Sequence, residues 1–167
     1  LGLALTTSRK KPLARSAVSA ARTRLGDEPM EWLFSRCAEA WTARQSDEEN
    51  DTWRGLSLYA MDGTLLTAPD TKENRTYFGV HKNRIGNAPF PQVRLVALMA
   101  LRMHLVADVA FGSQKNGELT YAQQLVSSIP DYSLTILDRL YHDANVLIPL
   151  STNGTERHFL LRLKKNF

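Results

Sequence analysis

Apolar residues recur twice at helical spacing in the first part of the chain, which predicts two amphipathic helices. These positions are Leu13, Ala17, Val18, Ala21 and Leu25, then Met30, Leu33, Phe34, Cys37 and Trp41. Gly26 is placed to end the first helix and Asp27 to cap the second. The acidic run at 47–51 predicts an exposed linker. We expect the two helices to form a packing layer rather than a DNA-contacting pair, because they carry few basic residues.

From Trp53 onward the pattern changes to short apolar runs that predict strands, with two further helical patterns between them. The predicted strands cover 56–61, 92–101, 104–111, 133–137 and 158–163, and the predicted helices cover 118–129 and 143–150. Residues 64–91 are rich in Gly, Pro, Asn, Lys and Arg, which predicts a long loop. The order β-β-β-α-β-α-β predicts an α/β fold with a mixed sheet, preceded by a small two-helix segment.

The composition is that of a globular chain. The 167 residues are 43% hydrophobic and 23% charged, and charged residues interrupt the most apolar region well short of the roughly 20 residues that a membrane helix needs. Cys37 is the single cysteine, which excludes an internal disulfide and favours a reducing cytoplasm. The net charge of +4 arises within residues 52–167. Such an excess attracts nucleic acid, although a surplus of this size also serves solubility.

Two aspartates come directly after predicted strands. Asp62 follows residues 56–61, and Asp138 follows residues 133–137. Pairing of these strands would bring both carboxylates to one edge of the sheet, where they repel unless a cation lies between them. Carboxylate oxygens suit Mg²⁺ or Mn²⁺, and two such ions can support phosphoryl transfer. A solvated turn at each position is the alternative that these two residues alone leave open.

Seven segments of the chain, taken together, form a family pattern. They are Ser16–Gly26, Leu58–Thr64, Thr67–Asn74, Pro91–Val96, Ala110–Glu118, Leu134–Tyr141 and Ile148–Leu150. In their order and spacing, from about Pro12 to Lys165, they resemble the transposases of the insertion sequence four family. Each segment is a weak signal alone, whereas the set is specific.

The resemblance implies a DDE transposase with an RNase H-like fold, in which three acids bind divalent metal, Mg²⁺ or Mn²⁺, and catalyse DNA cleavage and strand transfer. Asp62 matches the first of these acids and Asp138 the second. The third is a glutamate on a later helix, in a Tyr, Arg, Glu, Lys motif that the 29 residues after Asp138 do not contain. We therefore expect a catalytic domain that is incomplete at its C-terminal side and has little activity alone.

Other acids near the expected site have ordinary explanations. We expect Glu156 in a turn and Asp143 at the start of a helix, rather than either as a substitute for the third acid. Asp70 is also expected in a turn. Leu140 stands where the family usually has glycine, which puts the backbone geometry after Asp138 in question.

Basic residues with aromatic residues between them predict a DNA-contacting surface in the long loop and beside the second aspartate. The predicted DNA-binding residues are Lys72, Arg75, Lys82, Arg84 and Arg139. A solvated loop anchored by Tyr77 and Phe78 is the alternative. The resemblance implies double-stranded DNA as the partner, at transposon ends and target. A homodimer on the DNA and a cytoplasmic, nucleoid-associated location are expected with it.

The sequence thus predicts a helical segment with an acidic linker over residues 1–51 and a partial RNase H-like catalytic domain over residues 52–167. The predicted function is that of a transposase fragment. Two other functions stay open: a non-enzymatic product that binds DNA or interferes with a full-length transposase, and a metal nuclease built on the two aspartates alone.

Overall fold

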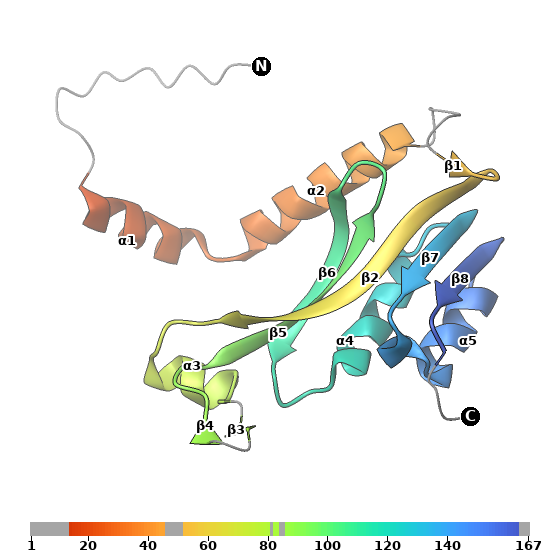
Figure 1. The fold of residues 1–167 in the computed structure, drawn as a ribbon. Helices are drawn as coiled ribbons and strands as arrows, with labels where there is room; N and C mark the ends of the chain where they lie inside the picture. The colour runs from red at the N-terminus through yellow and green to blue at the C-terminus, as the bar shows by residue number, and fades with distance from the viewer. Residues whose placement is uncertain (1–13, 46–51, 81, 84–85, 164–167) are drawn as a thin grey trace, which may run out of the picture. The chain divides into compact units, whose positions relative to one another are not determined.

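The computed structural model describes residues 14–45, 52–80, 82–83 and 86–163 of the chain (Figure 1). Contacts divide the chain into two units, 1–36 and 37–167, and the boundary falls within helix α2 (Glu28–Gln45). The predicted domain boundary after residue 51 stays a prediction, and the predicted acidic linker lies outside the described residues. Within the described part, no helix has both the length and the apolar character needed to cross a bilayer.

Both predicted N-terminal helices are confirmed. Helix α1 (Arg15–Leu25) ends at Gly26, which has a φ of 75°, a conformation that costs glycine little because it has no Cβ. The Gly26 N–H donates to the Arg22 carbonyl at 3.1 Å and so satisfies one of the free carbonyls at the helix end. Helix α1 buries none of its residues, so the predicted packing role of its apolar face stays a prediction.

A mixed six-stranded sheet forms the centre of the second unit, in the order β6-β5-β2-β7-β8 with β1 paired to β2. Its strands are β1 (Thr52–Trp53), β2 (Leu56–Thr67), β5 (Gln92–Ala100), β6 (Leu105–Ser113), β7 (Ser133–Leu137) and β8 (Arg157–Leu161). Strands β2, β5 and β6 are antiparallel neighbours, whereas β7 and β8 run parallel to β2. The predicted α/β fold with an RNase H-like mixed sheet is confirmed.

The predicted loop over residues 64–91 is wrong in part. Strand β2 continues to Thr67, because its backbone pairs with β5 as far as the Thr67 and Gln92 partners and this ladder overrides the turn tendency of Gly63. Beyond β2 the chain forms helix α3 (Lys72–Tyr77) and a short antiparallel pair, β3 (Lys82–Asn83) with β4 (Gly86–Asn87). The Thr71 side chain caps α3 by accepting a hydrogen bond from the backbone N–H of residue 74.

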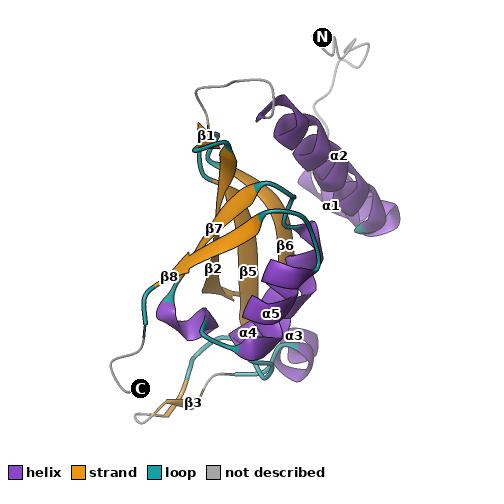
Figure 2. Cartoon of the chain, turned by 90° about the vertical axis from the view of Figure 1, so that its right-hand side faces the viewer, coloured by secondary structure: helices purple, strands orange, loops and turns teal. Residues whose placement is uncertain are grey.

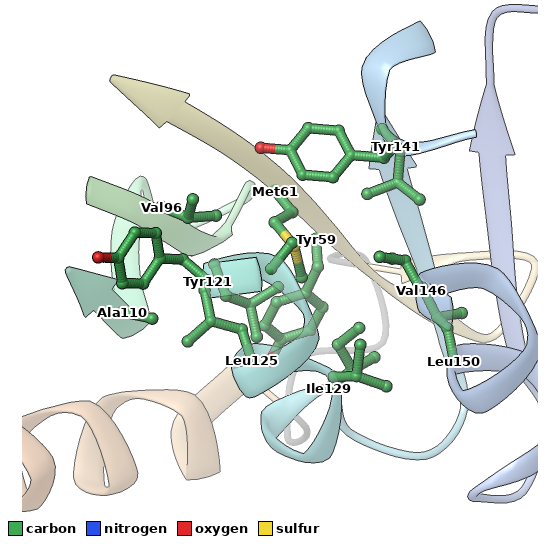
Figure 3. Close-up of a cluster of buried hydrophobic side chains, with 14 of the residues drawn as sticks. Tyr59, Met61, Val96, Ala110, Tyr121, Leu125, Ile129, Tyr141, Val146 and Leu150 are labelled. Carbon is green, nitrogen blue, oxygen red and sulfur yellow. The ribbon is translucent and has the colours of Figure 1, made fainter. Parts of the chain in front are cut away.

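Two helices cover one face of the sheet, helix α4 (Glu118–Leu125) and helix α5 (Ala144–Thr152) (Figure 2). Helix α4 continues into the 3₁₀ turn η2 (Val126–Ser128). Alternate residues of the central strands face these helices, because side chains alternate along a strand. The buried cluster, part of which Figure 3 shows, comprises Tyr59, Met61, Val96, Leu98, Ala100, Ala110, Tyr121, Ala122, Leu125, Val126, Ile129, Leu137, Tyr141, Val146 and Leu150. This core fixes strand β2, which carries Asp62, and strand β7, which Asp138 directly follows.

Candidate active site

The register of the central parallel strands places Asp62 beside Asp138. Met61 of β2 pairs with Leu137 of β7, and each aspartate is the next residue along its chain. Neighbouring strands lie roughly 4.8 Å apart, so the two residues are adjacent on the sheet. Met61 and Leu137 are buried, whereas both aspartates are exposed, as strand alternation requires. The sheet therefore brings together the two residues that the sequence predicted as catalytic.

Backbone groups hold one oxygen of each carboxylate. The Gly63 N–H donates to Asp62 Oδ1 at 2.9 Å. The Leu140 N–H donates to Asp138 Oδ1 at 2.6 Å, which makes Asp138 the cap of the 3₁₀ turn η3 (Arg139–Tyr141). No described residue donates a hydrogen bond to the second oxygen of either side chain. Among the described residues, one oxygen of each carboxylate is thus left without a hydrogen-bond donor.

This pair suits a divalent cation. Two adjacent carboxylates repel each other, and a cation between them removes the repulsion. Exposed carboxylate oxygens are the ligands that Mg²⁺ and Mn²⁺ prefer. In the described part of the chain, however, no three or more His, Cys, Asp or Glu side chains are grouped to hold a metal ion. The described site therefore offers two carboxylates.

Leu140 does not strain the turn after Asp138. It lies in η3 and is absent from the described non-glycine residues with positive φ. The η3 turn is closed by the N–H of Tyr141, which donates to the Asp138 carbonyl at 3.1 Å. Leucine therefore fits at the position where the family usually has glycine, and the backbone after Asp138 is not strained by it.

The structure adds Glu118, Tyr141 and Arg94 to the surroundings of the aspartates, and sequence reasoning missed all three. Glu118 Oε1 accepts a hydrogen bond from the Tyr141 hydroxyl at 2.7 Å, and Glu118 Oε2 lies 3.3 Å from Arg94 Nη1. A Cβ placed on Gly63 would lie 2.3 Å from Glu118 Cδ, so this side chain packs directly against β2. The sequence signal was the acid in the first turn of a predicted helix, which an ordinary helix start also explains.

Tyr141 stays protonated in this setting. Burial raises the pKa of its hydroxyl well above the ordinary value, the hydrogen bond to Glu118 raises it further, and the charges of Glu118, Asp62 and Asp138 act in the same direction. The negative charges disfavour a tyrosinate because it would add another anion beside them. Tyr141 is therefore a hydrogen-bond donor in the folded protein.

The predicted DNA-binding residues lie in different parts of the fold. Lys72 begins α3 and is exposed, and Arg139 begins η3 directly after Asp138 and is also exposed. The Arg75 guanidinium is already engaged, because it forms two hydrogen bonds with the Asp70 carboxylate and a third, at 2.9 Å, with the carbonyl of residue 89. That pairing holds the pKa of the Asp70 carboxyl below its ordinary value.

The other two predicted DNA contacts are Lys82 and Arg84. Lys82 begins β3, but its side chain lies outside the described residues, as Arg84 does entirely. All the DNA contacts stay predictions.

The two alternative acids have structural roles: Asp143 Oδ1 accepts from the N–H of residue 145 and caps α5, and Glu156 pairs with the side chain of residue 158.

A mixed sheet in this order, with one aspartate on β2 and a second directly after its parallel neighbour β7, is the arrangement of RNase H-like domains. The transposase DDE domain family matches residues 53–167. The chain is 37% identical over 155 residues to InsZ of Escherichia coli strain K12, and 37% identical over 153 residues to the transposase InsG for insertion sequence element IS4 of the same strain. The chain therefore belongs to the transposase DDE domain family, and its sequence is similar to that of the transposase for insertion sequence element IS4.

These alignments cover 92% of this chain, but only 51% of InsZ and 34% of InsG. The chain thus spans about half the length of one relative and about a third of the other. A solved piggyBac transposase synaptic complex with hairpin DNA is a weak structural match, with a TM-score of 0.46 and 11% identity over 66% of this chain and 24% of the other. Transposases of the DDE family act on DNA and use divalent metal ions.

Proposed function

We propose that Asp62 and Asp138 are the first two metal-binding acids of a transposase active site that cleaves transposon ends and joins them to target DNA. The observation that supports this proposal is the parallel register of β2 and β7, which makes Asp62 and Asp138 neighbours across the sheet. The membership of the chain in the DDE transposase family supports the same assignment. In this proposal residues 52–167 form the catalytic part, and residues 1–51 form a separate helical segment.

Asp62 and Asp138 would hold Mg²⁺ or Mn²⁺ through the oxygens that the backbone leaves available. A bound divalent ion supplies Lewis acidity, which lowers the pKa of a water or 3′-hydroxyl nucleophile and steadies the departing oxygen of the phosphodiester. The N–H groups of Gly63 and Leu140 fix the other carboxylate oxygens, so the available oxygens keep their direction. In this proposal Arg139, which directly follows Asp138, would contact a DNA phosphate near the cleaved bond.

We propose further that the 167 residues by themselves hold the metal weakly and cleave DNA slowly. The described part offers two carboxylates and no group of three metal-ligating side chains. A two-carboxylate site leaves a second ion poorly placed, and misplacement of reacting groups by about 1 Å can cost roughly 100-fold in rate. This low activity distinguishes the proposal from a nuclease that works on the two aspartates alone.

Metal binding by the purified chain tests the assignment. Titration with Mn²⁺, followed by the electron paramagnetic resonance signal of the free ion, should reveal a weak site. We expect Asp62→Asn and Asp138→Asn each to weaken binding at least about tenfold, because each removes one of two charged ligands. Glu31→Gln, at an exposed acid of α2, is the matched control and should bind as the unaltered chain does. Unchanged binding in both aspartate variants would contradict the proposal.

The alternative is a non-enzymatic product that binds DNA or interferes with a longer transposase. It is favoured by the same lack of a third ligand among the described residues. Binding to transposon-end DNA that weakens with salt but is unchanged by Asp62→Ala would support it. Mg²⁺-dependent nicking of plasmid DNA that Asp138→Asn abolishes would instead establish cleavage by the two-aspartate site.

A further inference from the structure

The carboxylate of Glu118 joins the three parts of the fold that surround the aspartate pair. Glu118 lies in the first turn of α4. Its Oε1 accepts from the hydroxyl of Tyr141, the last residue of the turn that Asp138 caps. Its Oε2 lies 3.3 Å from Nη1 of Arg94, on the strand that pairs with β2. One side chain thus links helix α4, the η3 turn and strand β5.

Gly63 gives Glu118 its place against β2. A Cβ at this position would lie 2.4 Å from Glu118 Oε1 and 2.7 Å from its Cγ, so any larger residue would displace the carboxylate. Gly63 directly follows Asp62, and its N–H binds the Asp62 carboxylate. The Glu118 side chain therefore rests on the peptide that orients the first aspartate, while it bonds to the turn that orients the second.

The Glu118 carboxylate is shielded from water and partnered. Its side chain is 15% exposed and that of Arg94 is 20% exposed, whereas Tyr141 is fully buried. Loss of one member of such a group leaves the others buried without a partner, which is costly. Among the described residues Arg94 Nε has no hydrogen-bond partner, and Glu118 is the acid that pairs with the Arg94 guanidinium. The contacts of Glu118 with Arg94 and Tyr141 are thus part of the packed interior rather than a solvent-exposed ion pair.

We propose that Glu118 is a positioning residue that sets the separation of Asp62 and Asp138 by tying Tyr141 and Gly63 to helix α4. This inference rests on the proposed function, in which the two aspartates share a divalent cation. Glu118 acts through its neighbours and is not itself a metal ligand. Residues that orient metal-binding carboxylates in this way contribute about tenfold or more to metal affinity.

The first test measures Mn²⁺ affinity of the whole chain. We expect Glu118→Ala to weaken Mn²⁺ binding by about tenfold and Tyr141→Phe to weaken it by a smaller factor. Glu118→Gln keeps the volume and the acceptor for the Tyr141 hydroxyl, so it should recover most of the lost affinity. Glu31→Gln is the control for loss of an acid elsewhere. Circular dichroism and thermal unfolding establish that each variant is folded at the temperature of the titration.

The second test needs no metal. In a Cys37→Ser chain, the pair Asp62→Cys and Asp138→Cys reports the separation of the two positions by the rate of disulfide formation, since a disulfide requires Cα atoms about 4.4–6.8 Å apart. Cys37 is the only native cysteine, so its removal leaves the introduced pair alone. We expect Glu118→Ala to slow disulfide formation several-fold and Glu118→Gln to restore most of the rate.

The two tests separate the inference from the proposed function. Slower disulfide formation in Glu118→Ala, in a chain that does not bind Mn²⁺ through its aspartates, would leave the positioning role standing and overturn the proposed function. Undiminished Mn²⁺ affinity and an unchanged disulfide rate in Glu118→Ala would overturn the positioning role and leave the function standing. If Glu118→Gln proves as weak as Glu118→Ala in both tests, Glu118 acts by its charge and the positioning role is wrong.

Discussion

Tyr141 is fully buried, and its hydroxyl donates a hydrogen bond to the Glu118 carboxylate near the aspartate pair. The residue therefore serves two needs, because its ring fills the core and its hydroxyl satisfies Glu118. Gly63 has no side chain, and this leaves the space that the Glu118 carboxylate occupies. At the scale of single residues, the surroundings of the aspartates depend on one large residue and one without a side chain.

Tyr141→Phe should change how stability responds to alkaline pH. The ordinary pKa of tyrosine is 10.0 and burial raises that of Tyr141, so the unfolded chain loses this proton at a lower pH than the folded one. The stability that the protonated Tyr141 hydroxyl contributes is fully present below pH 10 and is lost as the pH rises towards the folded-state pKa. We expect the free energy of unfolding, measured in urea, to fall less between pH 8 and pH 11 for Tyr141→Phe than for the unaltered chain. Equal declines would contradict the raised pKa.

Gly63→Ala should destabilise the protein by about 1–3 kcal/mol, because the added methyl group overlaps the Glu118 carboxylate. The Cβ would lie 2.3 Å from Glu118 Cδ. Urea unfolding of Gly63→Ala, Glu118→Ala and the double variant forms a thermodynamic cycle. We expect the double variant to lose less than the two single losses combined, since a shortened residue 118 removes the overlap. Additive losses would show that the two residues do not meet.

Among the elements, the junction of β7 and β8 has its own polar tie. Asp131, just before β7, accepts from the Thr155 N–H at 3.1 Å and from Arg157 Nε at 2.8 Å. Arg157 begins β8, so the tie fixes where the two parallel strands start to pair. Parallel strands are joined through a helix rather than a tight turn, and here α5 forms the crossover. The register at this junction therefore receives support from side chains.

Asp131→Asn tests that tie through the acid limb of stability. The Thr155 N–H and, next, the Arg157 side chain hold the pKa of Asp131 below its ordinary 3.8. A lowered folded-state pKa contributes stability that is present above about pH 4 and is lost as the pH falls through the folded-state value. The unaltered chain should therefore exceed Asp131→Asn in stability at pH 7, and the difference should shrink at pH 2 in thermal melts. A difference independent of pH would argue against the tie.

At the scale of the whole molecule, one face of the sheet holds the buried cluster with α4 and α5, and the basic excess is confined to residues 52–167. Leu98 belongs to this cluster and is fully buried. Leu98→Ala should destabilise the protein by about 2–5 kcal/mol, because it removes apolar contacts and leaves a cavity. Leu140→Ala, at a residue that is 42% exposed, is the control and should cost far less in urea unfolding. Similar costs at both positions would contradict this core.

DNA binding should depend on salt in proportion to the phosphates contacted. We expect Arg139→Ala and Lys72→Ala each to reduce the slope of log K against log salt by about one, as for a lost phosphate contact. Arg75→Ala should reduce it less, because the Arg75 guanidinium is held by Asp70. Fluorescence anisotropy with transposon-end DNA at several salt concentrations measures these slopes. A larger change for Arg75→Ala than for Lys72→Ala would reverse this ranking.

The sequence by itself predicted the order of most elements and the meeting of Asp62 and Asp138 at one edge of the sheet. This was possible because periodicity and turn residues act over short stretches that can be read without the fold. The sequence did not show that β2 runs through Gly63 to Thr67 or that α3 follows, since pairing with β5 along the whole strand overrode the local turn signal. Glu118 could not be singled out either. Its role depends on contacts with Gly63, Arg94 and Tyr141, which lie far from it in the chain and meet only when the helix packs on the sheet.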